Sequence, residues 1–416
     1  QAIGAQSITS HKMTWRLTAL IVTLCPGIVS RALELRKVDF RRRGLPTKAA
    51  EESQDSNGSL IALTSRESAC GRRGRRSRRV AWGECSICNL APFDRPTLYA
   101  KERADGCGAR LQEIISWAGV AARSGLNFGG VVTNGICQES HGADIFRAVS
   151  AVLGLQSPTD LFIEFPPEFD REYKGVNDFH KKFANGDKKL REYVPTGDVL
   201  VRDNCLACEL DNRNLSEFLS PKLLFFLRYE SKLGGLYKNM TIQGRREHRP
   251  VVAVHVRRGD VRPGTPFSLF TNEHDFQRLS PDDWYFEVVA RILKVLPNAD
   301  VHVFSSTENK YNSSDFDGFR QRNMTVHLDG DILDAWAVMA HANVLVMAKS
   351  AFSHVPAYLN TNCILFQPWW HKPLPGWIIA RDANGTASDD SSRGEPFFDI
   401  SELRNCLGRA DRLSQT

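Results

Sequence analysis

The sequence lacks an apolar run long enough to span a bilayer. The apolar run near its start, Leu17 to Val29, has about 13 residues, whereas a membrane helix needs roughly 20. Arg16 precedes this run, and the small residues of Ser30-Arg31-Ala32 follow it. This order is typical of a cleaved signal peptide. We expect residues 1–32 to be a signal peptide, with a short signal anchor in the membrane or a mitochondrial presequence as alternatives.

The chain also has little excess of one charge. It has 54 basic and 48 acidic residues, for a net charge of +6. Much of the positive charge precedes residue 80, in Arg41–Arg43 and Arg72–Arg79. Such runs are usually solvated tails, so we expect residues 33–92 to be a disordered basic stem. The remainder is close to neutral and offers no basic face for a nucleic acid.

Cysteine, by contrast, is not scarce, and the spacing of the cysteines helps to indicate in which cellular compartment the protein folds. The ten cysteines include two pairs with short spacing, Cys85/Cys88 and Cys205/Cys208, and more than a hundred residues separate one pair from the other. The two halves of a zinc site are typically about 12–20 residues apart, so disulfides are favoured over zinc. Six Asn-x-Ser/Thr sequons point the same way; they lie at Asn57, Asn214, Asn239, Asn312, Asn323 and Asn384. We expect a glycoprotein of the secretory pathway, in the Golgi or the ER lumen.

The segment after residue 95 predicts a first α/β module. A glycine-rich turn at Gly106–Arg110 is followed by helical periodicity over Ala109–Ala122 and a buried strand at Phe128–Thr133. A polar loop and a helix over Ala143–Leu153 follow, and parallel strands are expected from this order. Residues 165–215 predict loops and short helices, and Leu215–Leu236 a helix or helix pair.

A second module follows a linker at 243–250. Val251–Val256 is a β-branched run typical of a buried parallel strand. Ser280 is expected to cap a helix that has Pro281 at its first position and runs through Val295. Strands are expected at 299–304, 323–328, 344–347 and 363–366, and Asp331 is expected to cap a helix to Ala342. The second module therefore predicts a Rossmann-like half.

Two segments of this module have the chemistry of an anion site. His255–Asp260 follows a buried strand, and two guanidiniums there can donate bidentate hydrogen bonds to a diphosphate. Arg257 and Arg258 point to opposite faces of the strand, so one is expected to bind phosphate and the other to pair with Asp260. Ser350–Ser353 lies between a strand and a helix N-terminus, which also favours an anion. A solvated turn and an ordinary helix cap are the alternatives.

These segments resemble the GDP-fucose-dependent fucosyltransferase superfamily of α1,2-, α1,6- and protein O-fucosyltransferases. His255-Val-Arg-Arg-Gly-Asp260 is similar to its HxRRxD motif, and Met339–Ser353 looks like its helix, strand and S-T-F-S donor loop. Gly106–Arg110 resembles its GxGN turn, with Ala109 in place of Asn. The chain departs from the family at His354-Val-Pro356, where the family often has two tryptophans.

The resemblance implies a GT-B-like α/β fold in which two Rossmann-like domains face a cleft. Residues 93–245 would form the acceptor domain and 246–416 the donor domain. It implies that Arg258 holds the β-phosphate and that Ser350–Ser353, the serine loop, contacts phosphate or fucose. Further donor-site candidates are His255, Arg257, Ser350, Phe352, Ser353, Asp331, Asp334, Gly106 and Gly108. Candidates for the general base are Glu139 and His141 of the first module's polar loop, and Asp260.

The function implied is a glycosyltransferase that transfers fucose from GDP-fucose, with inversion, to a glycan or glycoprotein acceptor. It implies no metal and no cofactor beyond the donor substrate, and a nucleotide sugar as partner. Asp282-Asp283 and Asp389-Asp390 are interpreted as a helix start and a solvated loop. A catalytically inactive glycan-binding or scaffold relative, or transfer of another sugar, remain alternatives.

Overall fold

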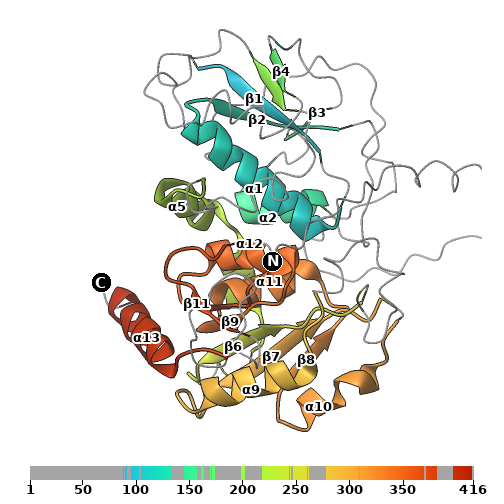
Figure 1. Ribbon diagram of the computed structural model, residues 1–416, viewed down its shortest axis with the longest axis vertical. Coiled ribbons are helices and arrows are strands. Elements are labelled where there is room, and N and C mark those ends of the chain that lie inside the picture. The colour runs from blue at the N-terminus through green and yellow to red at the C-terminus, as the bar shows by residue number, and fades with distance from the viewer. Residues whose placement is uncertain are drawn as a thin grey trace, which may run out of the picture. The chain divides into compact units, whose positions relative to one another are not determined.

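A computed structural model gives the fold (Figure 1). The residues that it describes are 88, 90, 95–102, 105–133, 145–156, 161–163, 169, 171–173, 198–201, 218–242, 244, 247–259, 261, 278–308, 310–369, 372–381 and 397–414. The expected signal peptide and nearly all of the expected stem lie outside them. Within the described part of the chain, no helix is long and apolar enough to cross a membrane.

The first half is a five-stranded sheet whose strand pairs are all parallel. The strand order is β3-β2-β1-β5-β4. In chain order the strands are β1 (Thr97–Lys101), β2 (Asn127–Val132), β3 (Phe162–Ile163), β4 (Arg171–Tyr173) and β5 (Val199–Val201). Helix α1 (Cys107–Arg123) joins β1 to β2, and α2 (Ile145–Leu153) precedes β3. The predicted parallel βαβ unit is therefore confirmed.

The second half is a six-stranded parallel sheet of order β11-β10-β9-β6-β7-β8. Its strands are β6 (Val251–His255), β7 (Asp300–Ser305), β8 (Thr325–Leu328), β9 (Val344–Val346), β10 (Cys363–Phe366) and β11 (Ile378–Ile379). Its helices and helical turns are α9 (Asp282–Leu293), η6 (Ser313–Phe316), α10 (Asp317–Arg320), α11 (Ile332–His341), α12 (Ala351–Leu359) and α13 (Ile400–Ser414). Between the halves run α5 (Pro221–Glu230) and α6 (Leu233–Asn239).

The two faces of the second sheet are covered by different helices. Alternate residues of β6 divide between two apolar clusters, as the strand pleat requires. Val252 and Val254 pack with α9, whereas Ala253 packs with α11 and α12. Figure 1 shows α9 on one face of this sheet and α11 and α12 on the other.

One apolar core is continuous from the first half into the second. The same cluster of buried residues contains Leu98 of β1, Trp117 of α1, Tyr358 of α12 and Leu345 of β9. At this junction Nε2 of Gln112 in α1 donates a hydrogen bond of 3.2 Å to the buried hydroxyl of Tyr358. The two halves are therefore packed together along α1 and α12.

A disulfide between Cys363 of β10 and Cys406 of α13 closes the second half. The two Cα atoms are 5.8 Å apart, and 43 positions separate the residues in the chain. Cys88, from the first of the short-spaced cysteine pairs, is also disulfide-bonded. Both observations agree with the expectation of disulfides. The exposed sequon residues Asn239, Asn312 and Asn323 are among the described residues.

The structure corrects several predicted elements. Helix α1 starts at Cys107, so most of the predicted glycine-rich turn is the first turn of this helix. Pro281 is the N-cap of α9, which starts at Asp282, one position later than predicted. Residues 165–215 were expected to form loops and short helices, but they contain strands β4 and β5. Runs of three residues are too short for periodicity to reveal.

The predicted fold class is confirmed. The chain is an α/β protein with two Rossmann-like parallel sheets, and residues of both halves line a common cleft. This is a GT-B-like arrangement. The remaining predicted strands and helices of the second half lie within about two residues of their observed bounds.

Candidate functional site

A cavity of about 840 Å³ lies at the carboxyl ends of the strands of the second sheet. Its walls come from the start of α1, the residues after α6, the ends of β6, β7 and β8, and the first turns of α11 and α12. In open parallel sheets this edge is where ligands bind. The volume is within the range of small-molecule sites.

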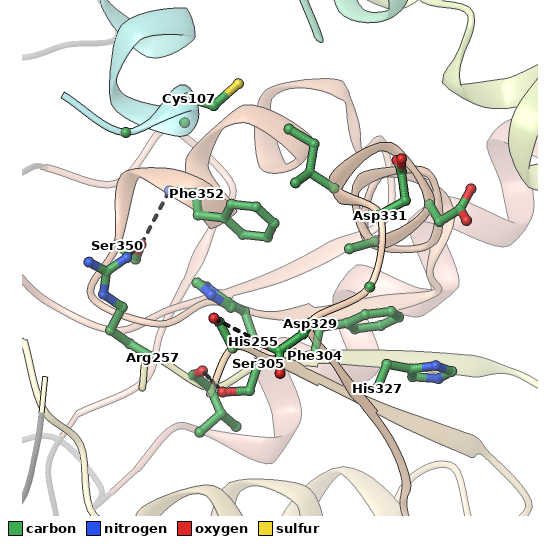
Figure 2. Close-up of a pocket in the computed structure, with 18 of the residues that line it drawn as sticks. Cys107, His255, Arg257, Phe304, Ser305, His327, Asp329, Asp331, Ser350 and Phe352 are labelled. Atoms are coloured by element: carbon green, nitrogen blue, oxygen red, sulfur yellow. Dashed lines mark hydrogen bonds between the residues drawn. The ribbon is translucent and has the colours of Figure 1, made fainter. Parts of the chain in front are cut away.

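Arg257 extends from the end of β6 into this cavity. Its Nη1 donates a hydrogen bond of 3.2 Å to Oγ of Ser350, and both residues line the cavity. Figure 2 shows the guanidinium of Arg257 beside Ser350. The β6 turn is held from the other side, where Oγ of Ser305 donates 2.8 Å to the carbonyl of Val256. The first motif arginine and the serine loop, ninety-three positions apart, therefore meet in one wall.

Arg258 has a different environment. The residue is 7 % exposed, and its side chain forms an ion pair with Asp282 in the first turn of α9. Its Nη1 also donates 2.7 Å to the carbonyl of Arg257. The guanidinium therefore braces the turn that holds Arg257, although Arg258 also contributes to the cavity lining. Asp260, which was expected to pair with one of the two arginines, lies outside the described residues.

The serine loop is divided between the cavity and the core. Ser350 is the N-cap of α12, and its hydroxyl accepts from the amide of Phe352 at 3.3 Å. Ser353 is completely buried, and its hydroxyl donates to the carbonyls of Ala348 and Ser350 at 3.2 and 3.1 Å. Ser353 was a predicted donor ligand, but the structure places it in the packing behind the loop, where its hydroxyl is directed to the backbone.

The start of α1 reaches the start of α12. A Cβ on Gly108 would lie 2.7 Å from Cα of Phe352 and 2.9 Å from its nitrogen, so only glycine permits this approach. Gly106, the N-cap of α1, and Gly108 both line the cavity. Two helix N-termini thus meet near Arg257, and the positive end of each helix dipole lies at this wall of the cavity. An anion is the ligand that this combination favours.

His255 occupies the floor of the site. It is 6 % exposed, and its ring lies 5.0 Å from the ring of Phe352. Its Nδ1 is buried and makes no hydrogen bond with the described residues. Burial, with the nearby charge of Arg257, lowers the pKa of His255 to about 3. The ring is therefore neutral near pH 7 and suits a hydrogen-bonding role better than that of a general base.

Carboxylates gather at the β8 end of the cavity. Asp331 caps α11 by accepting from the amide of Leu333 at 2.8 Å, and it pairs with Arg147 of α2 at 3.0 Å. Burial acts to raise the pKa of Asp331, but these two contacts hold it below the usual value. Asp334, one turn further, also lines the cavity. The prediction that Asp331 caps this helix is confirmed.

Two histidines of neighbouring strands, His302 of β7 and His327 of β8, also line the cavity. Nδ1 of His302 and Nε2 of His327 are 2.9 Å apart, and the ring of His327 stacks on that of Phe304 at 4.7 Å. His302 also lies 2.9 Å from a carboxylate oxygen of Asp300. No motif marks these residues. Among the described residues, no group of three or more His, Cys, Asp or Glu side chains is placed to hold a metal ion.

Several site residues were missed by sequence reasoning. Arg147, Phe304, His327, Arg278 and Trp369 all line the cavity. Trp369 follows the predicted strand at 363–366, so the rule that ligands bind at strand ends was a signal for it. Arg147 is the third residue of α2, and no local pattern distinguishes it. The candidate bases Glu139 and His141 lie outside the described residues and stay predictions.

Comparison with known proteins gives likenesses of structure only. No family model and no curated protein matches the sequence. The protein is similar to POFUT1 in complex with GDP, with 13% identity and a TM-score of 0.28, over 64% of this chain and 95% of that one. It is also similar to the E. coli heptosyltransferase WaaC with ADP, with 10% identity and a TM-score of 0.34, over 77% of this chain and 99% of that one. At these scores the likenesses establish no activity for this chain.

Proposed function

We propose that the protein is a glycosyltransferase whose donor is a nucleoside-diphosphate sugar, and that GDP-fucose is that donor. The observation that carries the proposal is the meeting of Arg257, Ser350 and the N-termini of α1 and α12 in one cavity. Such a cluster suits a diphosphate, and the cavity extends beyond it on both sides, as a nucleotide sugar requires. The choice of GDP-fucose follows from the resemblance of His255–Asp260 to the fucosyltransferase motif.

The chemistry follows from the charge on the leaving group. As the bond from the sugar to the diphosphate breaks, negative charge develops on the phosphate oxygens, and preformed donors there lower the barrier. Arg257 and the positive N-terminal ends of α12 and α1 supply this stabilisation. Arg258 keeps the β6 turn in place through Asp282. The general base for the acceptor hydroxyl stays a prediction among Glu139, His141 and Asp260.

We propose Arg257, in place of Arg258, as the arginine that binds the phosphates. Arg258 is a buried guanidinium that already forms an ion pair with Asp282, so it has less to gain from a ligand. Arg257 extends into the cavity and reaches Ser350, which also lines it. Arg258→Ala would leave the carboxylate of Asp282 without this ion pair, so its effect on stability must be measured together with its effect on binding. Arg257→Ala removes a cavity group at smaller risk to the fold.

Calorimetry with GDP in the presence of EDTA tests the proposal. We expect the intact chain to bind GDP with a Kd in the micromolar range, and Arg257→Ala to weaken binding about 10- to 100-fold, the worth of lost hydrogen bonds to a charged group. Arg320→Ala is the matched control, because Arg320 is exposed on α10 and pairs with Asp317 away from the cavity.

The outcomes separate the alternatives. Binding of GDP together with fucose transfer to a glycan acceptor supports the full proposal. Preference for ADP or UDP, in a thermal-shift panel of nucleotides, would replace GDP-fucose with another donor. Glycan binding without transfer would favour the inactive relative, and no nucleotide binding at all would refute the glycosyltransferase proposal.

A further inference from the structure

The strand order of the second sheet arranges the cavity as a line. Adjacent strands are about 4.8 Å apart, so the residues after successive strands follow one another across the site. From one side to the other these are Trp369 after β10, Ser350 after β9, Arg257 after β6, Ser306 after β7 and Asp329 after β8. The proposed diphosphate site, between β9 and β6, is therefore in the middle, and the cavity has two arms.

The arm on the β7 and β8 side is rich in oxygen. Ser306 and Asp334 line it with Phe304. The loop there is fixed by Asp329, whose carboxylate accepts from the amide and hydroxyl of Thr307 at 2.8 and 2.6 Å. Hydroxyl and carboxylate oxygens suit the ribose hydroxyls and the ring N–H groups of a nucleoside. A nucleotide sugar that crosses the middle of the site then has its sugar in the opposite arm.

The arm on the β10 side has different chemistry. The guanidinium of Arg278 lies over the ring of Trp369, with Cζ 5.3 Å from the ring centroid, and both residues line the cavity. Behind Trp369 lies the buried ring of His354, at 6.5 Å and nearly parallel to it. This contact holds the guanidinium of Arg278, which carries five N–H donors, at the wall of the arm.

We propose that Trp369 and Arg278 form the subsite for the sugar of the donor. A pyranose presents a set of hydroxyls and apolar C–H groups. Arg278 carries N–H donors for the hydroxyls, and the part of Trp369 that lines the cavity offers apolar surface to the C–H groups. This inference rests on the proposed function, since it needs a nucleotide sugar in the cavity.

The test compares two ligands that differ only in the sugar. Calorimetry with GDP and with GDP-fucose, without acceptor, is carried out on the full chain and on Trp369→Ala and Arg278→Ala. We expect both variants to bind GDP within about twofold of the unchanged protein and to bind GDP-fucose about tenfold more weakly, as expected for one or two lost hydrogen bonds and an aromatic contact. Trp369→Phe, which keeps an aromatic ring, should recover part of the loss.

Two control variants exclude effects on the fold. Trp377 packs against the same His354 ring but does not line the cavity, so Trp377→Ala should leave the ratio of the two affinities unchanged. Arg322 lies over Phe286 outside the cavity, and Arg322→Ala is the control for Arg278→Ala.

An equal loss of affinity for GDP and GDP-fucose would assign Trp369 and Arg278 to the phosphates and overturn the proposal, as would no loss for either ligand. If the unchanged protein binds GDP and the variants show an equal loss or no loss, the proposed function holds and the sugar subsite is refuted. If the unchanged protein binds neither GDP nor GDP-fucose, the proposed function and the sugar subsite are both refuted.

Discussion

At the scale of single residues, the two motif arginines show the limit of a motif. Alternation along β6 correctly predicts that Arg257 and Arg258 diverge, but it does not say which one forms a buried ion pair. The answer depends on Asp282, which comes from a helix start 24 positions later and pairs with Arg258. Contacts between segments this far apart are set by the packing of α9 on the sheet, and no local pattern contains them.

His255 gives a prediction about stability and pH. Its pKa is about 3 in the folded protein, against about 6.5 in an unfolded chain. Below pH 6.5 the unfolded chain therefore binds a proton that the folded protein does not bind until about pH 3, so stability is lost as the pH falls through this window. Between about pH 7 and pH 5 we expect a loss of about 2 kcal/mol from this residue.

Urea unfolding at the two pH values measures this loss. His255→Asn should reduce the difference in the free energy of unfolding between pH 7 and pH 5, even if it lowers stability at both. His248→Asn is the control, because His248 is exposed and its backbone φ of 55° suits asparagine. An unchanged pH dependence in His255→Asn would contradict the burial argument.

At the scale of elements, the proposed anion site depends on the junction of α1 with α12. Gly108→Ala would force a Cβ to within 2.7 Å of the Phe352 backbone, and backbone on both sides leaves no flexible group to yield. We expect a loss of about 1–3 kcal/mol, typical of overpacking, together with weaker GDP binding because the two helix starts move apart. Thermal unfolding and calorimetry on the same variant measure both effects.

The control for this variant is also a helical glycine. A Cβ added to Gly235 of α6 would meet no described atom within 4 Å, so Gly235→Ala should be neutral or slightly stabilising. Normal stability and GDP binding in Gly108→Ala would show that the helix junction can adjust and is not part of the site.

The elements differ in how far the sequence determines them. Strands β6, β7 and β10 and helices α1 and α11 were predictable from their apolar residues. These residues follow one another or alternate along the strands, and they recur at helical spacing in the helices. Strands β4 and β5 were not predictable, since their three residues are held by partners from β1 and from each other. Helix α13 was missed as well; it is held to β10 by the Cys363–Cys406 disulfide, whose pairing sequence alone leaves open.

At the scale of the whole molecule, the continuous core predicts cooperative unfolding. Residues of β1, α1, α12 and β9 belong to one buried cluster, so neither half can lose its packing without exposing the apolar surface of the other. Differential scanning calorimetry of the full chain should show one transition for the two sheets together. Two separate transitions would mean that the contacts between α1 and α12 contribute too little to join the halves.

The linear order of the strand ends has a consequence for how such a protein can diversify. The diphosphate is the part shared by all nucleoside-diphosphate sugars, and its proposed ligands lie after the two central strands, β9 and β6. The groups that would distinguish one base or one sugar from another lie after the flanking strands. Exchanging the loop after β10 would then alter the sugar while the nucleotide is kept, so that one scaffold can acquire a new donor by changing a single peripheral loop.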